Sequence, residues 1–312
     1  MVAYKLDEIN DMARNNPEEL IKKCDSIYHD RVVHAADLIT DNLSKSPIVL
    51  ISGPSGSGKT TTSKKIEEEL RSRGIMTHAL AMDSYFRTVN EDSPKTQDGK
   101  IDLESPHCVD MDLLTEHFNM LRNGASIDVP KYIFSEQRRA DKPSQTLQIG
   151  KNDVVVVEGI HALNDELTDA HPDALKLYIS ARSNVKEEDG SVCFKGTWMR
   201  LVRRVVRDYK FRGATPEYTL SLWANVRRGE KLNISPFKDK AALKFDSSFA
   251  YEVCVMKTIA EDLFRGVPEG TPRYQELRSI VPAFDKFEAI DPTLVAPESL
   301  LREFIGGGIY KY

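Results

Sequence analysis

Residues 48–60, IVLISGPSGSGKT, are the stretch of sequence that decides the fold. The four apolar residues at its start, Ile48 to Ile51, are typical of a parallel strand that is buried on both faces. The rest matches the pattern G-x-x-x-x-G-K-[ST] in full, with Gly53, Pro54, Ser55, Gly56, Ser57, Gly58, Lys59 and Thr60. A helix is expected from about Lys59 to Arg73, with Gly74 just past its end. A chance turn is the alternative, but the strand before and the helix after favour a phosphate-binding loop.

Each residue type in this loop has a physical role in binding a nucleoside triphosphate. Glycines let the backbone curl so that successive N–H groups point at phosphate oxygens, and the following helix presents its unpaired N–H groups to the same anion. Lys59 adds a full positive charge toward the β- and γ-phosphates, and the Thr60 hydroxyl is suited to bind Mg²⁺. We therefore expect the residues from Gly53 to Thr61 to bind ATP together with Mg²⁺.

Three further apolar runs predict strands of the same sheet. Residues 79–82 end at Asp83, residues 154–157 end at Glu158, and residues 175–179 form the last run. Strands that alternate with helical stretches predict an α/β fold of the P-loop NTPase type, with an open, mostly parallel sheet and flanking helices. Ligands of such sheets bind beyond the carboxyl ends of the strands, so the loop, Asp83 and Glu158 are expected to converge there.

The two carboxylates at strand ends are candidates for metal binding and proton transfer. Glu158 follows four valines, at a place that suits a direct or water-mediated contact with Mg²⁺. Asp83 could accept a proton from an acceptor hydroxyl and could also help to hold the metal. The structural alternatives are a Glu158 that only faces solvent and an Asp83 that only caps the turn after it.

Four arginines share one face of a predicted helix further along the chain. They are Arg200, Arg203, Arg204 and Arg207, at positions i, i+3, i+4 and i+7. Valines occupy another face, and Arg212 and Gly213 end the stretch. A solvated charged face and a patch for nucleic acid or membrane are two interpretations. The third, favoured because a phosphate-binding loop lies upstream, is a lid that closes over the nucleotide and neutralises the γ-phosphoryl group.

The composition of the 312 residues is that of an ordinary globular protein and excludes several classes. Acidic residues outnumber basic ones by 48 to 43, so the net charge of −5 predicts no general affinity for nucleic acid. No apolar run reaches the ~20 residues that a membrane helix needs, and the start, MVAYKLDEIN, does not read as a signal peptide. The four cysteines form no metal-binding spacing. A cytoplasmic protein without membrane or nucleic-acid partners is expected.

Three regions are expected along the chain. They are a helical extension for packing or dimerisation at 1–45, a P-loop core at 46–260 with the lid near 184–213, and a C-terminal helical extension at 261–312. Residues 87–106 and 184–196 are polar and are predicted to be mobile surface loops. The dimerisation alternative leaves a homo-oligomer open.

Taken together, these motifs resemble the uridine kinase and phosphoribulokinase family of P-loop kinases. The matching pieces are GPSGSGKTT at 53–61, MDSYF at 82–86, DLESP at 102–106, VPKYIF at 129–134, VVVVEGIHAL at 154–163 and RLVRRVVRDYKFRG at 200–213. The resemblance covers roughly residues 47–260 and is more specific than the loop alone. The ending SLLREFIGG at 299–307 is similar to a bacterial uridine kinase-like subgroup.

The resemblance implies ATP-dependent, Mg²⁺-assisted phosphorylation of a hydroxyl, typically the 5′-hydroxyl of uridine or cytidine. By position, Asp83 matches the catalytic aspartate, and Thr60 and Glu158, together with Asp83, match the magnesium partners. The implied catalytic group is Asp83, Lys59, Arg203 and Arg207, and the implied ATP-binding residues include Arg200 and Arg204. The implied acceptor-binding group is Asp83, Tyr85, Glu104, Tyr132, Gln137 and Arg212.

Two of these positions depart from the family pattern. Gln137 stands where the family often has a histidine that reads the pyrimidine, and Glu104 stands where an aspartate usually binds the ribose hydroxyls. Another small alcohol, such as a sugar or a sugar phosphate, is a second candidate acceptor, because Arg138 and Arg139 could meet a phosphate. A nucleotide switch is disfavoured because the patterns D-x-x-G and N-K-x-D do not occur, and an RNA-binding ATPase is a further alternative.

Overall fold

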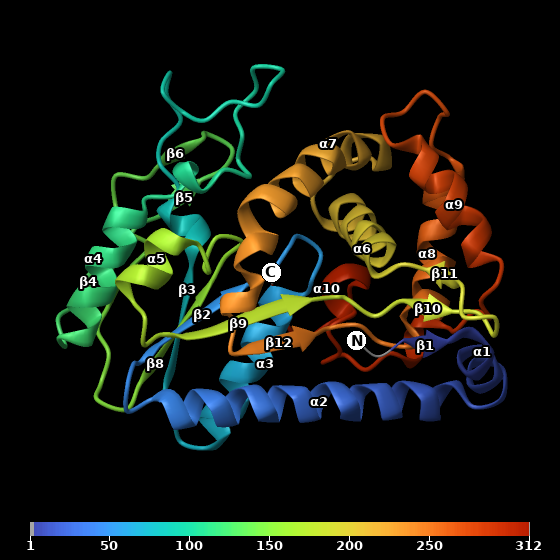
Figure 1. The fold of residues 1–312 in the computed structure, drawn as a ribbon, viewed down its shortest axis with the longest axis horizontal. Coiled ribbons are helices and arrows are strands. Elements are labelled where there is room, and N and C mark those ends of the chain that lie inside the picture. Colours follow the sequence, from blue (N-terminus) through green and yellow to red (C-terminus); the bar gives the residue numbers. More distant parts are fainter. Residues whose placement is uncertain (1–2, 312) are drawn as a thin grey trace.

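Five parallel strands form the central sheet of the structure, a computed structural model that describes residues 3–311. The strands are β2 (Ile48–Ser52), β3 (Thr77–Ala81), β8 (Val154–Glu158), β9 (Leu175–Ser180) and β12 (Leu243–Asp246). Their order across the sheet is β12-β9-β2-β8-β3, and every neighbouring pair is parallel. Helices lie on both faces (Figure 1), which confirms the predicted open α/β sheet of the P-loop NTPase type.

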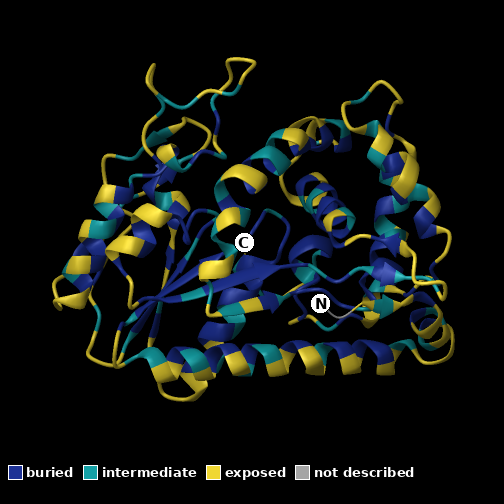
Figure 2. Ribbon diagram, viewed as in Figure 1, coloured by how far each residue is buried: buried dark blue, intermediate teal, exposed yellow. Residues whose placement is uncertain are grey.

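The apolar runs divide their side chains between two hydrophobic cores, one on each face of the sheet. Val49 and Ile51 of β2 belong to a large core that most of the helices share, whereas Ile48 and Leu50 belong to a smaller one. A strand imposes this alternation because its successive side chains point to opposite faces. Every residue of β2 is buried (Figure 2), as the unbroken apolar run predicts.

The turns after β2 and β3 place the predicted site residues at one edge of the sheet. α3 (Lys59–Ser72) follows β2, and Gly74 has a φ of +78° just past the helix end, as predicted. β3 ends at Ala81, one residue earlier than the predicted strand, because Met82–Tyr85 forms a short 3₁₀ helix. Asp83 therefore lies on a turn beyond the carboxyl end of β3.

The N-terminal region packs along the P-loop core rather than apart from it. It comprises β1 (Tyr4–Lys5), α1 (Leu6–Asn15) and α2 (Pro17–Asn42), the long blue helix of Figure 1. The hydroxyl oxygens of Tyr28 on α2 and Thr62 on α3 are 2.7 Å apart, and the Tyr28 ring stacks on Phe249. Residues 6–15 and 17–42 of this region are helical, and α2 contacts the phosphate-loop helix directly.

The prediction of a surface loop without regular structure over residues 184–196 is wrong. β10 (Val185–Lys186) pairs with β1 in parallel and with β11 (Val192–Phe194) antiparallel, which makes a small three-stranded sheet. Cys193 and Phe194 are buried, so apolar contacts hold the hairpin in place. Polar residues surround Cys193 and Phe194 in the sequence, so the burial of these two residues could not be predicted from it. In the predicted loop further upstream, residues 87–105 contain turns and isolated bridges only.

The arginine helix α6 (Gly196–Phe211) is largely buried and does not stand open as a lid. Nine of its residues are buried, among them Arg200 and Arg203. α7 (Pro216–Gly229), α8 (Glu252–Arg265) and α10 (Arg302–Ile305) pack against it. In this structure α6 is therefore part of the core beside the phosphate-binding loop. The prediction that this helix is a lid that closes over the nucleotide is corrected, because three other helices already pack against it.

The remaining elements complete the two sides of the sheet. They are α4 (Met111–Arg122), β4 (Ile127–Val129), β5 (Tyr132–Ile133), β6 (Arg138–Arg139), β7 (Gln145–Leu147), α5 (Asp165–Ala170) and α9 (Tyr274–Phe284), with short 3₁₀ or π-helical turns at Pro106–Cys108, Glu230–Ile234, Ser235–Lys240 and Pro292–Leu294. β4 pairs with β7 and β5 with β6, both antiparallel. Within residues 3–311, no helix is both long and apolar enough to cross a membrane.

Candidate active site

The phosphate-binding loop curls between β2 and α3 in a form that only glycine adopts without strain at several positions, two of which are Gly56 and Gly58. Gly56 and Gly58 have φ values of +75° and +77°. A Cβ at Gly56 would lie 2.7 Å from the carbonyl oxygen of Arg200, so a larger residue would also collide with α6. The loop glycines thus serve both the backbone turn and the close approach of the arginine helix.

Lys59, Thr60 and Glu158 meet at the carboxyl ends of β2 and β8. The Thr60 hydroxyl donates to Oε2 of Glu158 at 3.0 Å, and Lys59 Nζ lies 3.9 Å from Oε1 of the same carboxylate. Burial raises the pKa of Glu158, while the Lys59 charge acts to lower it. A hydroxyl and a carboxylate side by side are oxygen ligands of the kind that Mg²⁺ prefers.

These oxygens fit a magnesium ion that is held mainly by its nucleotide. Within residues 3–311, no three histidine, cysteine or carboxylate side chains form a ready-made metal cluster. Mg²⁺ in nucleotide sites usually keeps several waters and phosphate oxygens and takes only one or two protein ligands. Thr60 and Glu158 match that requirement, and Asp83 lies in the same electrostatic neighbourhood.

Asp83 faces the loop from the end of β3. Protein surrounds its carboxylate on most sides although water still reaches it, and this partial desolvation raises its pKa. The positive charges of Lys59 and Arg212 oppose the rise, so both lie close enough to act on Asp83. Asp83, Lys59 and Arg212 thus belong to one charged cluster although they are far apart in the chain.

Glu104 belongs to the same cluster. Burial raises its pKa from 4.5 to about 7, Arg204 and Lys59 act to lower it, and Asp102 acts to raise it. Its backbone N–H donates to Oδ1 of Asp102 at 3.3 Å, and its carbonyl accepts from Asn233 at 2.8 Å. The Glu104 carboxylate lies against the end of α7, because a Cβ at Gly229 would come within 3.1 Å of its Oε2.

Three arginines of α6 hold the loop itself. Arg200 donates to the Ser55 carbonyl at 3.3 Å, Arg203 to the Gly56 carbonyl at 3.3 Å, and Arg204 to the Ser55 hydroxyl at 2.8 Å. Arg200 and Arg203 are 2% and 0% exposed and form ion pairs with Glu230 and Glu252. These buried positions support a role for Arg200 and Arg203 in holding the backbone of the phosphate-binding loop. The sequence had instead predicted that both arginines contact the phosphates directly.

Arg207 and Arg212 lie at the end of α6 nearest solvent. Arg207 donates to Oδ1 of Asp208 through Nε at 2.9 Å and Nη2 at 2.8 Å, and Arg212 Nη1 lies 3.5 Å from the same oxygen. Both line a cavity of about 410 Å³ together with Phe211, Arg302, Glu303, Gly306, Gly307, Gly308 and Tyr310. These two arginines, unlike Arg200 and Arg203, can reach a ligand in a cavity.

A second cavity begins at Phe86, just after the 3₁₀ turn that carries Asp83, although Asp83 itself does not line it. It has a volume of about 440 Å³ and is lined by Phe86, Arg87, Thr88, Val89, Asn90, Asp92, Ser93, Pro94, Leu103, His107, Cys108 and Tyr132. Phe86, Tyr132 and Phe134 form an aromatic cluster with ring centroids 4.9 to 5.8 Å apart. The Tyr132 hydroxyl is buried and has no hydrogen-bond partner within the described residues. A buried hydroxyl without a partner lowers the stability of the fold, and a ligand group that hydrogen-bonds to Tyr132 would remove this penalty.

Of the six predicted acceptor residues, Tyr132 alone lines this cavity, whereas Asp83, Tyr85, Glu104, Gln137 and Arg212 do not. Tyr85 is fully buried, and its hydroxyl lies 2.8 Å from Nδ1 of His117, which directs it toward α4. Gln137 is exposed and has a φ of +52° in the turn between β5 and β6. The prediction that Tyr85 contacts the acceptor is therefore corrected, because its side chain belongs to the core.

The acidic partners of the loop are the residues that sequence reasoning missed. Glu230 and Glu252 neutralise Arg200 and Arg203, and Glu303 accepts hydrogen bonds from Thr61. The sequence held one general indication of such residues: if the helix that carries the arginines is buried, its arginines need acidic partners. No spacing in the sequence indicates which acids these are.

Comparison with known proteins agrees with this arrangement. The family model described as "Phosphoribulokinase / Uridine kinase family" matches residues 48–253. The uridine kinase of Macrococcus caseolyticus is 32% identical over 188 residues, which are 60% of this chain and 80% of that protein. The uridine kinase of Anoxybacillus flavithermus is 31% identical over 185 residues, 59% of this chain and 78% of that protein.

A solved structure of D-glycerate 3-kinase from Cryptococcus neoformans has a TM-score of 0.42 and 13% identity, over 69% of this chain and 92% of that chain. The family model spans well over half of the chain and contains the loop, Asp83, Glu158 and the arginine helix. The chain therefore belongs to the phosphoribulokinase / uridine kinase family.

Proposed function

We propose that this protein is a kinase that transfers the γ-phosphoryl group of ATP to a hydroxyl of a nucleoside, with uridine or cytidine as the leading acceptor. The observation that carries the proposal is the meeting of Lys59, Thr60 and Glu158 with Asp83 at the carboxyl ends of β2, β8 and β3. This arrangement places the phosphate-binding Lys59 and the Asp83 carboxylate within electrostatic reach of each other. Kinship with small-molecule kinases supports the same reaction class.

In the proposed reaction the protein positions two substrates and compensates charge. The loop amides and Lys59 hold the phosphates, and Mg²⁺ bound through Thr60 and Glu158 would neutralise part of their charge. Asp83 orients the acceptor hydroxyl and takes its proton as the oxygen bonds to the γ-phosphorus and the bond to ADP breaks. Arg204, Arg207 and Arg212 supply further positive charge beside the loop.

The cavity near Asp83 favours a nucleoside as the acceptor. Its aromatic cluster offers flat faces on which a base can stack, and the buried Tyr132 hydroxyl can bond to a polar edge of the base. A phosphorylated sugar would need free cations near the cavity. Arg87, which lines the cavity, instead pairs with Asp110 at 2.9 Å. Arg139 donates to the carbonyls of Tyr85 and Phe86 and also pairs with Asp110, and Arg138 bonds to Glu136.

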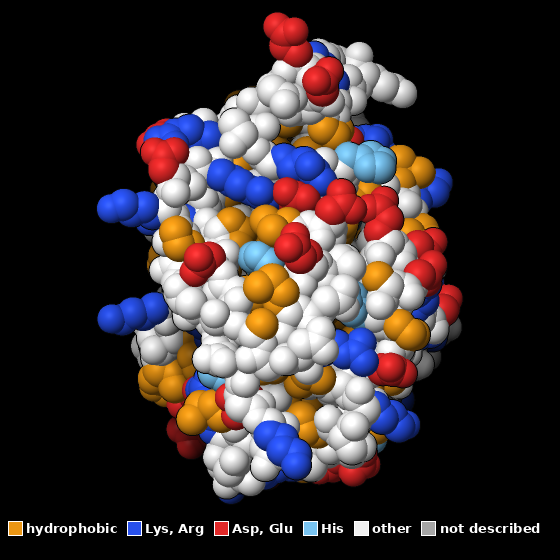
Figure 3. Space-filling view, turned by 90° about the vertical axis from the view of Figure 1, so that its left-hand side faces the viewer, with side chains coloured by type: hydrophobic (Ala, Val, Ile, Leu, Met, Phe, Trp, Pro, Cys, Tyr) orange, Lys and Arg blue, Asp and Glu red, His pale blue; other side chains and the backbone are white. Residues whose placement is uncertain are grey.

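The RNA-binding alternative receives no support from the face over α4 and residues 87–105. Figure 3 shows that positive and negative side chains are interspersed on this face, with hydrophobic ones scattered between them. Binding to a nucleic-acid backbone typically uses a continuous basic stripe.

The decisive experiment follows ADP and product formation with Mg-ATP and a panel of nucleosides, sugars and sugar phosphates. We expect uridine or cytidine to raise ADP release above background hydrolysis. Replacing Asp83 by Asn should lower the transfer rate by at least about 100-fold, because the proton acceptor is lost, and should leave ATP affinity nearly unchanged. Asp41→Asn, on an exposed residue of α2, is the matched control. Full transfer by Asp83→Asn would refute the role of Asp83, and no stimulation by any acceptor would refute the kinase proposal.

A further inference from the structure

The C-terminal segment lies directly against the phosphate-binding loop. We name residues 298–310 the C-terminal strap. A Cβ at Gly58 would lie 2.6 Å from Cδ1 of Leu300, and the Arg203 guanidinium lies 5.0 Å from the centre of the Phe304 ring. Leu300 and Phe304 are fully buried, so this part of the strap is packed firmly against the phosphate-binding loop. The strap lies outside the stretch that the family model matches.

Glu303 of the strap bonds to the first turn of α3, the turn whose N–H groups bind phosphate in phosphate-loop helices. Oε2 of Glu303 accepts the Thr61 backbone N–H at 3.3 Å and the Thr61 hydroxyl at 2.6 Å. Thr61 is the third residue of α3, and the N–H groups of that first turn face the phosphates when a nucleotide is bound. The carboxylate of Glu303 is thus an internal anion at a position suited to a phosphate oxygen.

The surroundings of Glu303 suit an exchange of one anion for another. Arg203 and Arg212 attract its carboxylate, whereas Glu158 lies near enough to repel it. The cavity of about 410 Å³ that Glu303 lines also exposes Arg207, Arg212 and Arg302. The Glu303 side chain can therefore turn away from Thr61 and find new cationic partners without any movement of the strap backbone.

We propose that Glu303 sets the affinity for the phosphoryl donor: its carboxylate occupies the N–H and hydroxyl of Thr61, and the triphosphate must displace it to bind. The inference rests on the proposed function, because it takes the loop as the donor site. Glu303 lines the cavity that Arg207 and Arg212 share and does not line the aromatic cavity proposed for the acceptor, so its effect should fall on donor binding.

The test removes the charge of Glu303 and keeps the shape of its side chain. Glu303→Gln should bind β,γ-imido-ATP with Mg²⁺, and inorganic tripolyphosphate, at least about fivefold more tightly than the wild type, a typical size for coupling between competing sites. In turnover the KM for ATP should fall, and the KM for the acceptor should stay unchanged. The probes are measured by isothermal titration calorimetry on the full chain.

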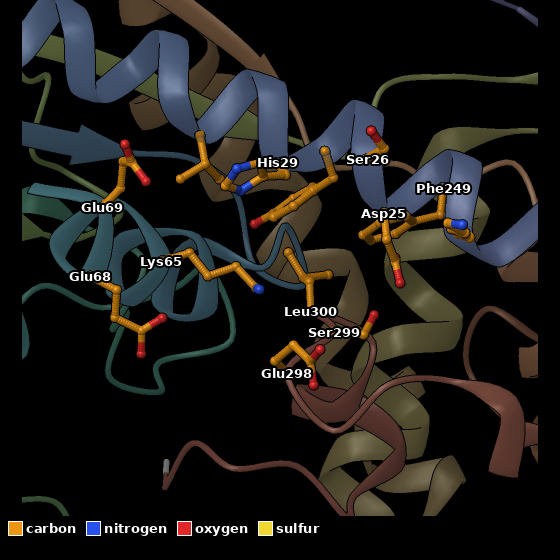
Figure 4. Close-up of a pocket in the computed structure, with 13 residues that line it drawn as sticks. Asp25, Ser26, His29, Lys65, Glu68, Glu69, Phe249, Glu298, Ser299 and Leu300 are labelled. Carbon is orange, nitrogen blue, oxygen red and sulfur yellow. The ribbon is translucent and has the colours of Figure 1, made fainter. Parts of the chain in front are cut away.

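The control removes the same charge from the same strap at a different place. Glu298 lines a separate cavity of about 520 Å³, where it faces Asp25 and Lys65 between α2 and α3 (Figure 4). Glu298→Gln should leave the affinity for both probes within about twofold of the wild type, because it does not touch Thr61.

Each outcome decides the matter. Equal or weaker donor binding by Glu303→Gln would overturn the proposal and leave Glu303 as a structural partner of α3. If that variant does not fold, a crystal structure of the wild type with β,γ-imido-ATP decides instead. We expect the Glu303 carboxylate to leave Thr61 in that complex, and a retained contact would refute the exchange. If the wild type binds neither probe, the proposed function itself fails.

Discussion

At the scale of single residues, three carboxyl groups lie within electrostatic reach of Lys59, where burial partly desolvates them. The pKa values of Asp83, Glu104 and Glu158 are all raised, and burial is the largest cause in each case. Lys59 lowers all three, so it stabilises the ionised forms that the proposed chemistry uses. Such a concentration of shifted groups is typical of a functional site, and it has a cost in stability that can be measured.

Glu104 provides the clearest test of that cost. Its pKa rises from 4.5 to about 7 on folding, so the folded state binds a proton more tightly than the unfolded state. The free energy of unfolding should therefore fall as the pH rises between these two values, and stay lowered above them. Glu104→Gln should be more stable than the wild type at pH 8, and the difference should vanish near pH 4. Urea unfolding across this range measures it, with the exposed Glu91→Gln as control. A difference that does not depend on pH would contradict the assignment.

At the scale of elements, α6 and the phosphate-binding loop behave as one unit. The arginines of the helix bond to loop carbonyls on one side and to buried acids on the other. A buried arginine needs such a partner, because an isolated charge inside a protein is costly. The position of the loop therefore depends on acids that lie on the π-helical turn Glu230–Ile234 and on α8.

Removing one buried acid should destabilise the protein and loosen the loop. Glu252→Gln leaves Arg203 buried without its countercharge, and we expect a loss of about 3 kcal/mol in the free energy of unfolding, together with weaker ATP binding. Glu261→Gln, on the same helix, breaks a partly exposed pair with Arg265 and should cost less than about 1 kcal/mol. Equal losses for the two variants, measured by urea unfolding, would show that the Arg203 ion pair does not support the loop.

At the scale of the whole molecule, the three regions expected from the sequence share one hydrophobic core. The larger core contains Leu6 and Tyr28 from the N-terminal region, Ile51 from the sheet, and Phe304 and Ile305 from the C-terminal strap. The N- and C-terminal regions both touch α3, through Tyr28 and Glu303. The regions are thus structural parts of one folding unit.

This shared core predicts a single unfolding transition for the full chain. Trp198 and Trp223 lie in α6 and α7, so their fluorescence reports on one side of the molecule, whereas far-ultraviolet circular dichroism reports on all the helices. Because the same core contacts both, the two signals should change at the same urea concentration. Separate midpoints would indicate that the terminal regions unfold independently of the sheet.

The parts of the site that the sequence predicted are those that depend on local chemistry. The loop from Gly53 to Thr60 needs glycines at positive φ and a helix start, and both requirements show within a few residues. Asp83 and Glu158 were predictable because parallel strands end at one edge of the sheet. Tyr85 was wrongly assigned to the acceptor site because the sequence does not show which way a side chain on a turn points. In the structure this side chain is buried in the hydrophobic core, where its hydroxyl meets His117.

By itself, the sequence determined the parallel sheet, the phosphate-binding loop and the family, because short-range patterns of burial and backbone geometry encode them. Only the tertiary structure decided what the arginines and the strap do. Arg203 meets Glu252 across 49 residues, and Thr61 meets Glu303 across 242. The spacing of the arginines is the same whether they face solvent, phosphate or a buried acid. Packing selects among these states, since a buried charge is stable only where the rest of the fold supplies its partner.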